Sequence, residues 1–469
     1  MKRYLIFFVF IVGLMQLFAV ITLPNIIGNN MVLQQNSDVK LWGVAKGNTI
    51  VTVKVSWSNK IYKTLSDSDG NWMLKVQTSI AGGPYEISFS DGQKKTISNV
   101  MLGEVWLCSG QSNMEMPVKG YNAQPVDFSL DAINKADSSL PIRLFKIEKI
   151  KSVKPTTFLA DNWQLNNPIS VKEFSAIGYF YALYLQYVLK VPVGIISAAW
   201  GGVSIETFMD SLSLSQFQKV KIPKLNTDKL AKPFHCELYN AMIYPLKNVI
   251  IKGVIWYQGE SNVWQWDLYK KQFPALVANW RNTFDAGEFP FYFAQIAPWK
   301  YNAINGQTAA QLREVQQFLA ESVPNAGMVP TIDTGDSLNI HPAAKKLIAE
   351  RFAHLALTKT YHVKGIEYQA PTFKTMTIVK DTVVLDFNNA ELGLHANSNL
   401  IESFEIAGID SIFKPAKAVI VEKSTKIKLT ETTIKNPIAA RYAFRNYTPA
   451  SIFNNFGYPL LPFRSDDWK

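Results

Sequence analysis

The middle of the chain, from about residue 100 to 360, alternates between short apolar segments and longer amphipathic ones. The apolar segments have the length and the Val, Ile and aromatic content of buried strands, and they are Val105–Cys108, Val193–Ala198, Gly253–Tyr257, Phe291–Ile296 and Met328–Ile332. The amphipathic segments have the spacing of helices, and they are Ser175–Leu189, Asp267–Phe284, Thr308–Ser322 and Ala343–Leu357. Buried strands that alternate with helices predict an α/β fold, in which a parallel sheet is covered on both faces.

The two flanking regions have a different pattern, in which short strand-like segments are separated by turn residues. In residues 20–98 the segment Thr49–Trp57 is rich in Val and Trp, and Asp67–Asn71 and Gly82–Pro84 have turn composition. We therefore expect an N-terminal β-sandwich over 20–98, the α/β domain over 99–360 and a C-terminal β-rich region over 361–469.

The first 19 residues have the layout of a cleavable signal peptide. Lys2 and Arg3 precede the apolar run Tyr4–Phe18, and Ala19 is a small residue at the expected cleavage point. The run is shorter than the roughly 20 residues of a comfortable membrane span, although an uncleaved anchor is the alternative. We expect a secreted or periplasmic protein with no membrane segment in its mature form.

Charge and cysteine content exclude some classes of function and leave others open. The net charge is +11, but the basic residues are scattered, which favours a basic protein surface over nucleic-acid binding. The two cysteines, Cys108 and Cys236, are as compatible with a disulfide as with free thiols. No histidine has ligand-type spacing, so the sequence predicts no metal site.

Polar residues follow the first strand of the predicted sheet. Gln111, Ser112 and Asn113 come directly after it, where a serine hydroxyl is presented at the carboxyl edge and the following backbone N–H groups can bind an oxyanion. A serine at such a place is more often a turn residue or a helix cap. Catalysis by Ser112 therefore requires partners from the other strand ends.

The other strand ends supply candidate partners. Gly201 and Gly202 follow the second strand and allow close approach of the backbone to a ligand, or simply form a tight turn. The third strand is followed by a polar loop that consists of Gln258, Gly259, Glu260, Ser261 and Asn262. His341 follows the last strand and precedes a helix, so it is the candidate general base for Ser112.

These motifs resemble the sialate O-acetylesterase family of SGNH hydrolases. The residues that carry the likeness are Glu104 to Met114, Trp200-Gly201-Gly202, Trp256 to Asn262 and Ile340-His341-Pro342. Outside them, the likeness includes Leu23-Pro24, Asn30 to Gln35, Leu238-Tyr239-Asn240, Pro462-Phe463-Arg464 and Asp466. The resemblance implies a flavodoxin-like three-layer α/β/α domain with flanking β-domains and neither metal nor organic cofactor. It also implies hydrolysis of acetyl esters on sugars through an acetyl-serine intermediate.

The same resemblance assigns the roles of the site residues. Ser112 matches the nucleophile, His341 the base, and the backbone of Ser112 or Asn113 and of Gly201 or Gly202 the oxyanion side. The polar residues expected beside the substrate are Gln111, Gln258, Gly259, Asn262 and Asn339.

The acid that orients the histidine is where the chain departs from the family pattern. Relatives carry an aspartate shortly before the histidine, where this chain has Leu338 and Asn339. We expect Asp336 or Glu260 to take the role, with Asp333 or a Ser–His pair without an acid as the alternatives.

The substrate is less constrained than the reaction. An O-acetylated sialic acid is the substrate that the family name implies, and a basic protein suits its carboxylate. Acetylated xylan or xyloglucan is the main alternative, for which Trp264, Trp266 and Trp299 are candidate platform residues. A carbohydrate-binding protein that has lost catalysis is a second alternative.

Overall fold

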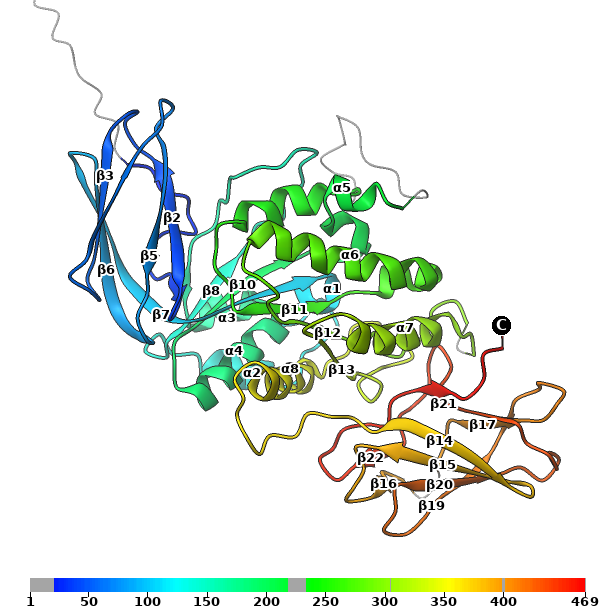
Figure 1. The fold of residues 1–469 in the computed structure, drawn as a ribbon. Coiled ribbons are helices and arrows are strands. Elements are labelled where there is room, and N and C mark those ends of the chain that lie inside the picture. Colours follow the sequence, from blue (N-terminus) through cyan, green and yellow to red (C-terminus); the bar gives the residue numbers. More distant parts are fainter. Residues whose placement is uncertain (1–20, 218–232, 304, 399–400, 469) are drawn as a thin grey trace, which may run out of the picture.

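Three parts follow one another along the molecule in the computed structural model, which describes residues 21–468 except 218–232, 304 and 399–400. An N-terminal β-sandwich and a C-terminal β-region lie at opposite ends of a central α/β domain (Figure 1). The predicted signal peptide lies outside the described residues. Among the helices of the described residues, none is both long and apolar enough to cross a bilayer.

The central sheet has the strand order β13-β12-β11-β7-β10-β8-β9. Its strands are β7 (Lys94–Gly110), β8 (Ile142–Lys146), β9 (Gln164–Leu165), β10 (Val193–Ala199), β11 (Gly253–Tyr257), β12 (Phe291–Ala294) and β13 (Ala326–Val329). All neighbouring pairs are parallel except β8 and β9. The chain order reverses between β7 and its two neighbours, β10 and β11, and this is the place where α/β sheets of this kind bind ligands.

Helices cover both faces of this sheet. On one face α6 (Trp266–Phe284) packs against α7 (Thr308–Ser322), and on the other α4 (Ala176–Leu189) packs against α8 (Lys345–Lys359) (Figure 1). Each face has its own buried core. Trp256 and Trp280 belong to the first core, and Trp106 and Tyr181 belong to the second.

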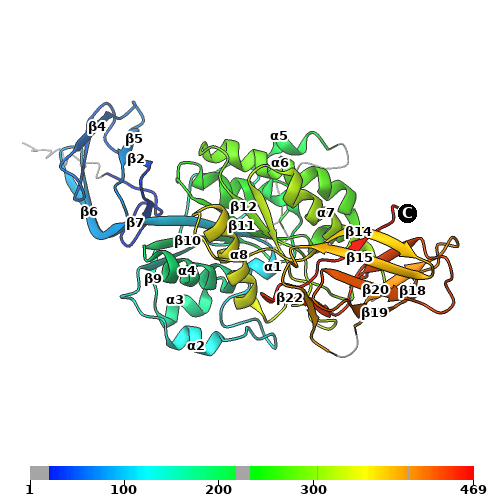
Figure 2. The ribbon, with the colours of Figure 1, turned by 60° about the horizontal axis from the view of Figure 1, so that its bottom comes forward.

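The N-terminal sandwich and the central sheet share one strand. The sandwich contains β1 (Val32–Gln34), β2 (Asp38–Val44), β3 (Ile50–Val55), β4 (Ile61–Leu65), β5 (Asn71–Gln77) and β6 (Gly82–Ser90). The first part of β7 pairs with β6, and its last part pairs with β10 and β11 in the central sheet (Figure 2). The boundary that we predict at residue 98 lies within this continuous strand.

The carboxylate of Glu104 ties these two domains together. Glu104 is buried and accepts hydrogen bonds from Gln34 (3.1 Å), Gln35 (2.7 Å) and the hydroxyl of Tyr361 (2.8 Å). The same hydroxyl accepts from the indole N–H of Trp106 at 2.8 Å. Because each of these three partners donates, the buried carboxylate is stabilised by hydrogen bonds.

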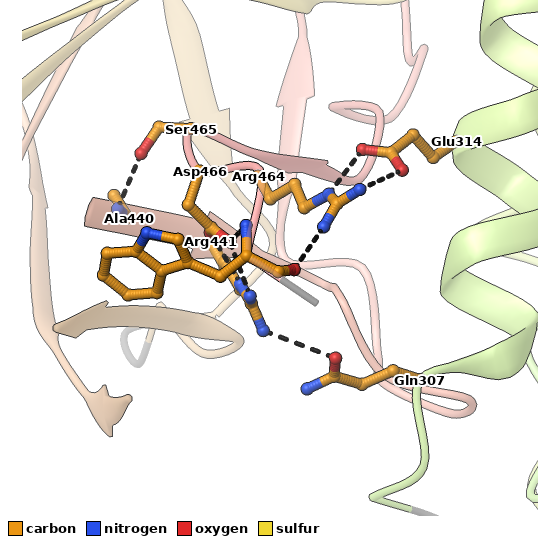
Figure 3. A network of polar contacts seen from close by, with 8 residues as sticks. Gln307, Glu314, Ala440, Arg441, Arg464, Ser465 and Asp466 are labelled. Carbon is orange, nitrogen blue, oxygen red and sulfur yellow. Dashed lines mark hydrogen bonds and ion pairs between the residues drawn. The ribbon is translucent and has the colours of Figure 1, made fainter. Parts of the chain in front are cut away.

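The C-terminal region consists of small antiparallel sheets that pack on α7. Its strands are β14 (Thr372–Val379), β15 (Thr382–Asn388), β16 (Leu394–Ala396), β17 (Phe404–Ala407), β18 (Lys414–Pro415), β19 (Lys417–Ile420), β20 (Lys426–Thr430), β21 (Ala439–Tyr442), β22 (Ile452–Asn454) and β23 (Phe463–Arg464). Arg464 makes a bidentate ion pair with Glu314 of α7, and Arg441 pairs with Asp466 and reaches Gln307 (Figure 3).

The predicted fold class is confirmed, because a mixed α/β sheet covered by helices is flanked by antiparallel β-sheets. The two cysteines, Cys108 and Cys236, are buried and free.

Candidate functional site

Ser112 lies at the carboxyl end of β7, at the centre of the sheet. Gly110 ends the strand with φ 137°, and a Cβ at this position would lie 2.1 Å from the carbonyl oxygen of Tyr257. Only glycine fits there. The chain then turns at Gln111 into the short helix α1 (Ser112–Glu115), which leaves Ser112 partly exposed at the edge of the sheet.

His341 meets Ser112 at this edge. The Nε2 atom of His341 lies 2.8 Å from the Oγ of Ser112, although 229 positions separate the two residues. The ring of Tyr121 packs edge-on against the imidazole, with 5.4 Å between ring centroids, and its hydroxyl donates to the carbonyl oxygen of Ser112. A hydroxyl that donates to an imidazole has the geometry of a nucleophile and its base.

The other ring nitrogen of His341 contacts a neutral amide. Its Nδ1 lies 2.6 Å from the Oε1 of Gln124, in the loop after α1. An amide oxygen only accepts, so Nδ1 carries the hydrogen and Nε2 is the acceptor for Ser112. Gln124 therefore fixes the tautomer that a general base requires.

The carboxylates that we expected to orient His341 are engaged elsewhere. Asp336 is exposed and accepts from the backbone N–H of Leu338. Asp333 pairs with Arg351, and Glu260 accepts from the side chain of Asn113 at 2.5 Å. The structure thus replaces the expected acid with Gln124, since the loop that contains it folds over the histidine.

Asn339, which we expected beside the substrate, uses its side chain to stabilise a backbone turn. Its Oδ1 accepts from the backbone N–H of His341 at 2.9 Å, which forms a tight turn just before the ring. Asn339 thus helps to place His341.

Gly201 lies against the nucleophile, but its N–H group is occupied. It donates to the Oε2 of Glu115 at 2.5 Å, and Glu115 also forms an ion pair with Lys149. This contact corrects the expectation that the Gly201 N–H faces an oxyanion. A Cβ on Gly201 would lie 3.2 Å from the Cβ of Ser112, so the glycine is needed for close approach. Gly202 is exposed, with φ 72°.

The polar loop after β11 is held by its own side chains. Gln111, Gln258 and Asn262 are at most 3% exposed. Gln258 donates to Asn262 (2.7 Å) and to Gln111 (3.2 Å), and Gln111 accepts from the N–H groups of Gly259 (3.4 Å) and Ser261 (3.2 Å). We expected these residues beside the substrate, but burial and mutual hydrogen bonding make them the support of the loop.

Burial determines the protonation of the groups around the serine. Together with the nearby charge of Lys345, the smaller cause, it lowers the pKa of His341 to about 4. Burial lowers the pKa of Lys345 to about 7, against the opposing effect of Glu260. Burial raises the pKa of Glu260, and the hydrogen bond from Asn113 opposes this rise. The imidazole is therefore neutral at pH 7 and able to accept a proton.

Four residues at this site were not predicted from the sequence: Gln124, Tyr121, Glu115 and Lys345. Glu115 follows Ser112 by three positions, and Lys345 follows His341 by four, so proximity to the predicted pair was the available signal. Gln124 and Tyr121 lie in a loop without strand or helix pattern, so nothing marked them.

The candidate platform tryptophans differ in exposure. Trp264 is 53% exposed, whereas Trp266 and Trp299 are partly buried against the core.

The three-layer α/β/α architecture and the serine–histidine contact at the carboxyl edge of its sheet define an α/β esterase. Residues 102–358 match the family model described as carbohydrate esterase, sialic acid-specific acetylesterase. The chain belongs to this sialate O-acetylesterase family of carbohydrate esterases, as the sequence motifs predicted.

Curated relatives and a solved structure agree with this membership. The human sialate O-acetylesterase is 30% identical over 382 residues, which cover 74% of this chain and 72% of the human protein. The mouse sialate O-acetylesterase is 27% identical over 487 residues, with 90% and 89% coverage. A carbohydrate acetylesterase from Xanthomonas citri has a similar structure, with a TM-score of 0.85, 32% identity, and coverage of 96% of this chain and 100% of that one.

Proposed function

We propose that this protein removes acetyl groups from sugar hydroxyls, with Ser112 as the nucleophile and His341 as its general base. The observation that carries the proposal is the 2.8 Å contact between Ser112 Oγ and His341 Nε2 at the partly exposed carboxyl edge of the sheet. It is supported by the low pKa of His341, which keeps the base unprotonated at neutral pH.

The reaction follows from the direction of these hydrogen bonds. Ser112 Oγ attacks the acetyl carbonyl carbon as its proton passes to Nε2 of His341, and a tetrahedral oxyanion forms. When this intermediate collapses, the bond to the sugar oxygen breaks and His341 returns the proton to that oxygen. Water, deprotonated by His341, then attacks the acetyl-serine and releases acetate.

The oxyanion requires donors that the fold has not already used. The first N–H groups of a helix have no intrahelical acceptor, which leaves the backbone N–H groups of Ser112 and Asn113 in α1 for this role. Gly202 is a further candidate, whereas the N–H of Gly201 already donates to Glu115.

We propose an O-acetylated sialic acid, with the acetyl group at O9, as the substrate. The curated relatives are named for this activity, and the matched family model is described as sialic acid-specific. The net charge of +11 of the chain suits the carboxylate of a sialic acid.

Acetate release measured side by side on 9-O-acetylated sialic acid and acetylated xylo-oligosaccharides tests the substrate. A clear preference for the sialic acid supports the proposal, and a preference for the xylo-oligosaccharides replaces it with the plant-polysaccharide alternative. Ser112→Ala should abolish turnover on either substrate. Labelling of Ser112 by a fluorophosphonate probe separates an enzyme from a protein that only binds the sugar.

We also propose that the protein is exported, since residues 1–19 have the composition of a signal peptide. N-terminal sequencing of protein from the extracellular or periplasmic fraction should begin close to residue 20. A chain that starts at Met1 would contradict cleavage.

A further inference from the structure

Three buried polar side chains that the mechanism above does not use form a cluster next to the nucleophile. It consists of Asn113, Glu260 and Lys345, which come from three separate elements and are at most 7% exposed. Lys345 begins α8, Glu260 follows β11, and Asn113 is the residue after Ser112. A lysine and a glutamate buried at such a place carry a desolvation cost that a purely apolar core would avoid.

The side-chain amide of Asn113 is the centre of this cluster. Its Oδ1 accepts from Nζ of Lys345 at 2.5 Å, and its Nδ2 donates to Oε1 of Glu260 at 2.5 Å. Nδ2 also donates to the carbonyl oxygen of Ile340 at 3.1 Å. The cation fixes which end of the amide accepts, and the carboxylate fixes which end donates, so the amide has a single orientation.

These bonds connect the two residues of the proposed catalytic pair. Asn113 is adjacent to Ser112 in the chain, and Ile340 is adjacent to His341. The amide therefore links the backbone of the serine to the backbone of the histidine. Small displacements of such a pair reduce rates strongly, by up to about 100-fold for 1 Å.

Lys345 also acts on His341 through its charge. Burial is the largest cause of the low pKa of His341, and the charge of Lys345 is the second. Among the described residues, the other charged or titratable groups near the pair are Glu260 and Tyr257 from β11 and its loop, Tyr121 from the loop after α1, and Glu115 of α1, whose charge acts on Tyr121. Glu260 opposes the charge of Lys345.

We propose that Lys345 is a positioning residue for the esterase reaction. It acts through Asn113, together with Glu260, to hold Ser112 and His341 at hydrogen-bonding distance from each other. This inference rests on the proposed roles of Ser112 and His341. It assigns Lys345 and Glu260 no contact with the substrate.

The test measures kcat, KM and the pH profile of full-length Lys345→Met with 4-nitrophenyl acetate. We expect kcat to fall by about 10- to 100-fold while KM changes by less than about 2-fold, because substrate contacts remain. We also expect the acidic limb of kcat/KM to move up by about one pH unit, because a cation beside His341 has been removed. Lys346→Met, which changes the adjacent, partly exposed lysine, is the matched control. It should leave kcat, KM and the acidic limb unchanged.

An unchanged acidic limb in Lys345→Met overturns the proposal, even if kcat falls, because loss of structure alone lowers the rate without moving the limb. Lys345→Met/Glu260→Gln leaves no buried charge unpaired, so it takes the place of the single variant if that variant folds poorly. The acidic limb should move in the same direction but by less, because the opposing carboxylate has been removed as well. Ser112→Ala in the same assay separates the two proposals. Activity in Ser112→Ala would refute the catalytic pair, whereas an inactive Ser112→Ala with a wild-type-like Lys345→Met would refute only the role of Lys345.

Discussion

Gln124 accepts the Nδ1 hydrogen of His341 at 2.6 Å, in the position that a carboxylate occupies in a serine–histidine–aspartate triad. The amide oxygen fixes the ring and its tautomer as an aspartate would. It carries no negative charge, however, so it stabilises the imidazolium that forms during the reaction less well. With Lys345 nearby, the histidine of this site is a weaker base than in a triad with an acid.

The first prediction concerns the tautomer that Gln124 selects. In Gln124→Ala the imidazole loses the acceptor that holds the hydrogen on Nδ1. We expect kcat to fall by about 100-fold, within the range that general base catalysis contributes. Steady-state kinetics measures this, and Asn122→Ala, at an exposed position in the same loop, is the control. A wild-type kcat in Gln124→Ala would show that the ring is held by other contacts.

The second prediction concerns pH. His341 must be neutral to accept the proton of Ser112, and activity is lost as the pH falls through its pKa. Because burial lowers this pKa to about 4, kcat/KM should stay level from neutral pH down to about pH 5 and fall by half near pH 4. A profile measured between pH 3 and 8 checks this. An acidic limb near pH 6.5, the ordinary value for histidine, would contradict the buried environment of the ring.

The third prediction concerns a charged partner for His341, which should raise the pKa that burial lowers. Gln124→Glu places a carboxylate at Nδ1, and an anion next to an imidazolium raises its pKa. The acidic limb of kcat/KM should therefore move to higher pH by about one unit or more. The direction of the shift is the readout, and an acidic limb that does not move would mean that residue 124 does not contact the ring.

The sequence allowed the α/β core to be predicted because its strands are buried on both faces and its helices are long and amphipathic. The bounds of β11 and of α7 are those predicted. The predicted strands omitted β8 (Ile142–Lys146), which contains Arg143 and Lys146 and lies near the edge of the sheet. Charged residues in a short strand weaken the apolar pattern on which the prediction depended.

The candidate site was only partly predictable, for a physical reason. Strand ends of a parallel sheet meet at one edge, so Ser112 and His341 were expected to approach each other. The partner of the imidazole comes from a loop whose path depends on tertiary contacts, such as the backbone hydrogen bond from Asp127 to Ala343. The periodicity of a sequence does not determine such a path, which is why the sequence indicated Asp336 or Glu260 and not Gln124.

The fourth prediction concerns Gly201, which packs against the serine. A methyl group there would lie 3.0 Å from the Glu115 carboxylate and 3.2 Å from Cβ of Ser112. The carboxylate can rotate away, but the serine is fixed in α1, so we expect Gly201→Ala to lower kcat by about 10-fold through displacement of Ser112. Thermal unfolding should change little. Gly408→Ala, where the nearest atom is 3.5 Å away, is the control, and equal kinetics in the two variants would contradict close packing at Ser112.

The last prediction concerns the attachment of the C-terminal region to the α/β domain. Asn446 is 1% exposed, and its Oδ1 accepts from the backbone N–H of Ala309 at 2.9 Å, in the first turn of α7. The residue that precedes this helix, Gln307, makes no side-chain cap, so a residue from the C-terminal region supplies it. The Nδ2 of Asn446 also donates to the carbonyl oxygen of Ala303 at 2.8 Å.

Asn446→Ala removes the cap and leaves the buried backbone N–H of Ala309 without its acceptor, so the free energy of unfolding should fall by about 1 to 3 kcal/mol. Chemical denaturation of the full-length protein measures the loss, and Asn436→Ala, at an exposed position of the same region, is the control. Because the side chain of Asn446 bonds to the first turn of α7 and to Ala303, and not to Ser112 or His341, the Asn446 variant should keep the wild-type pH profile while it unfolds earlier. Equal unfolding free energies for the two variants would mean that the C-terminal region packs on α7 without stabilising it.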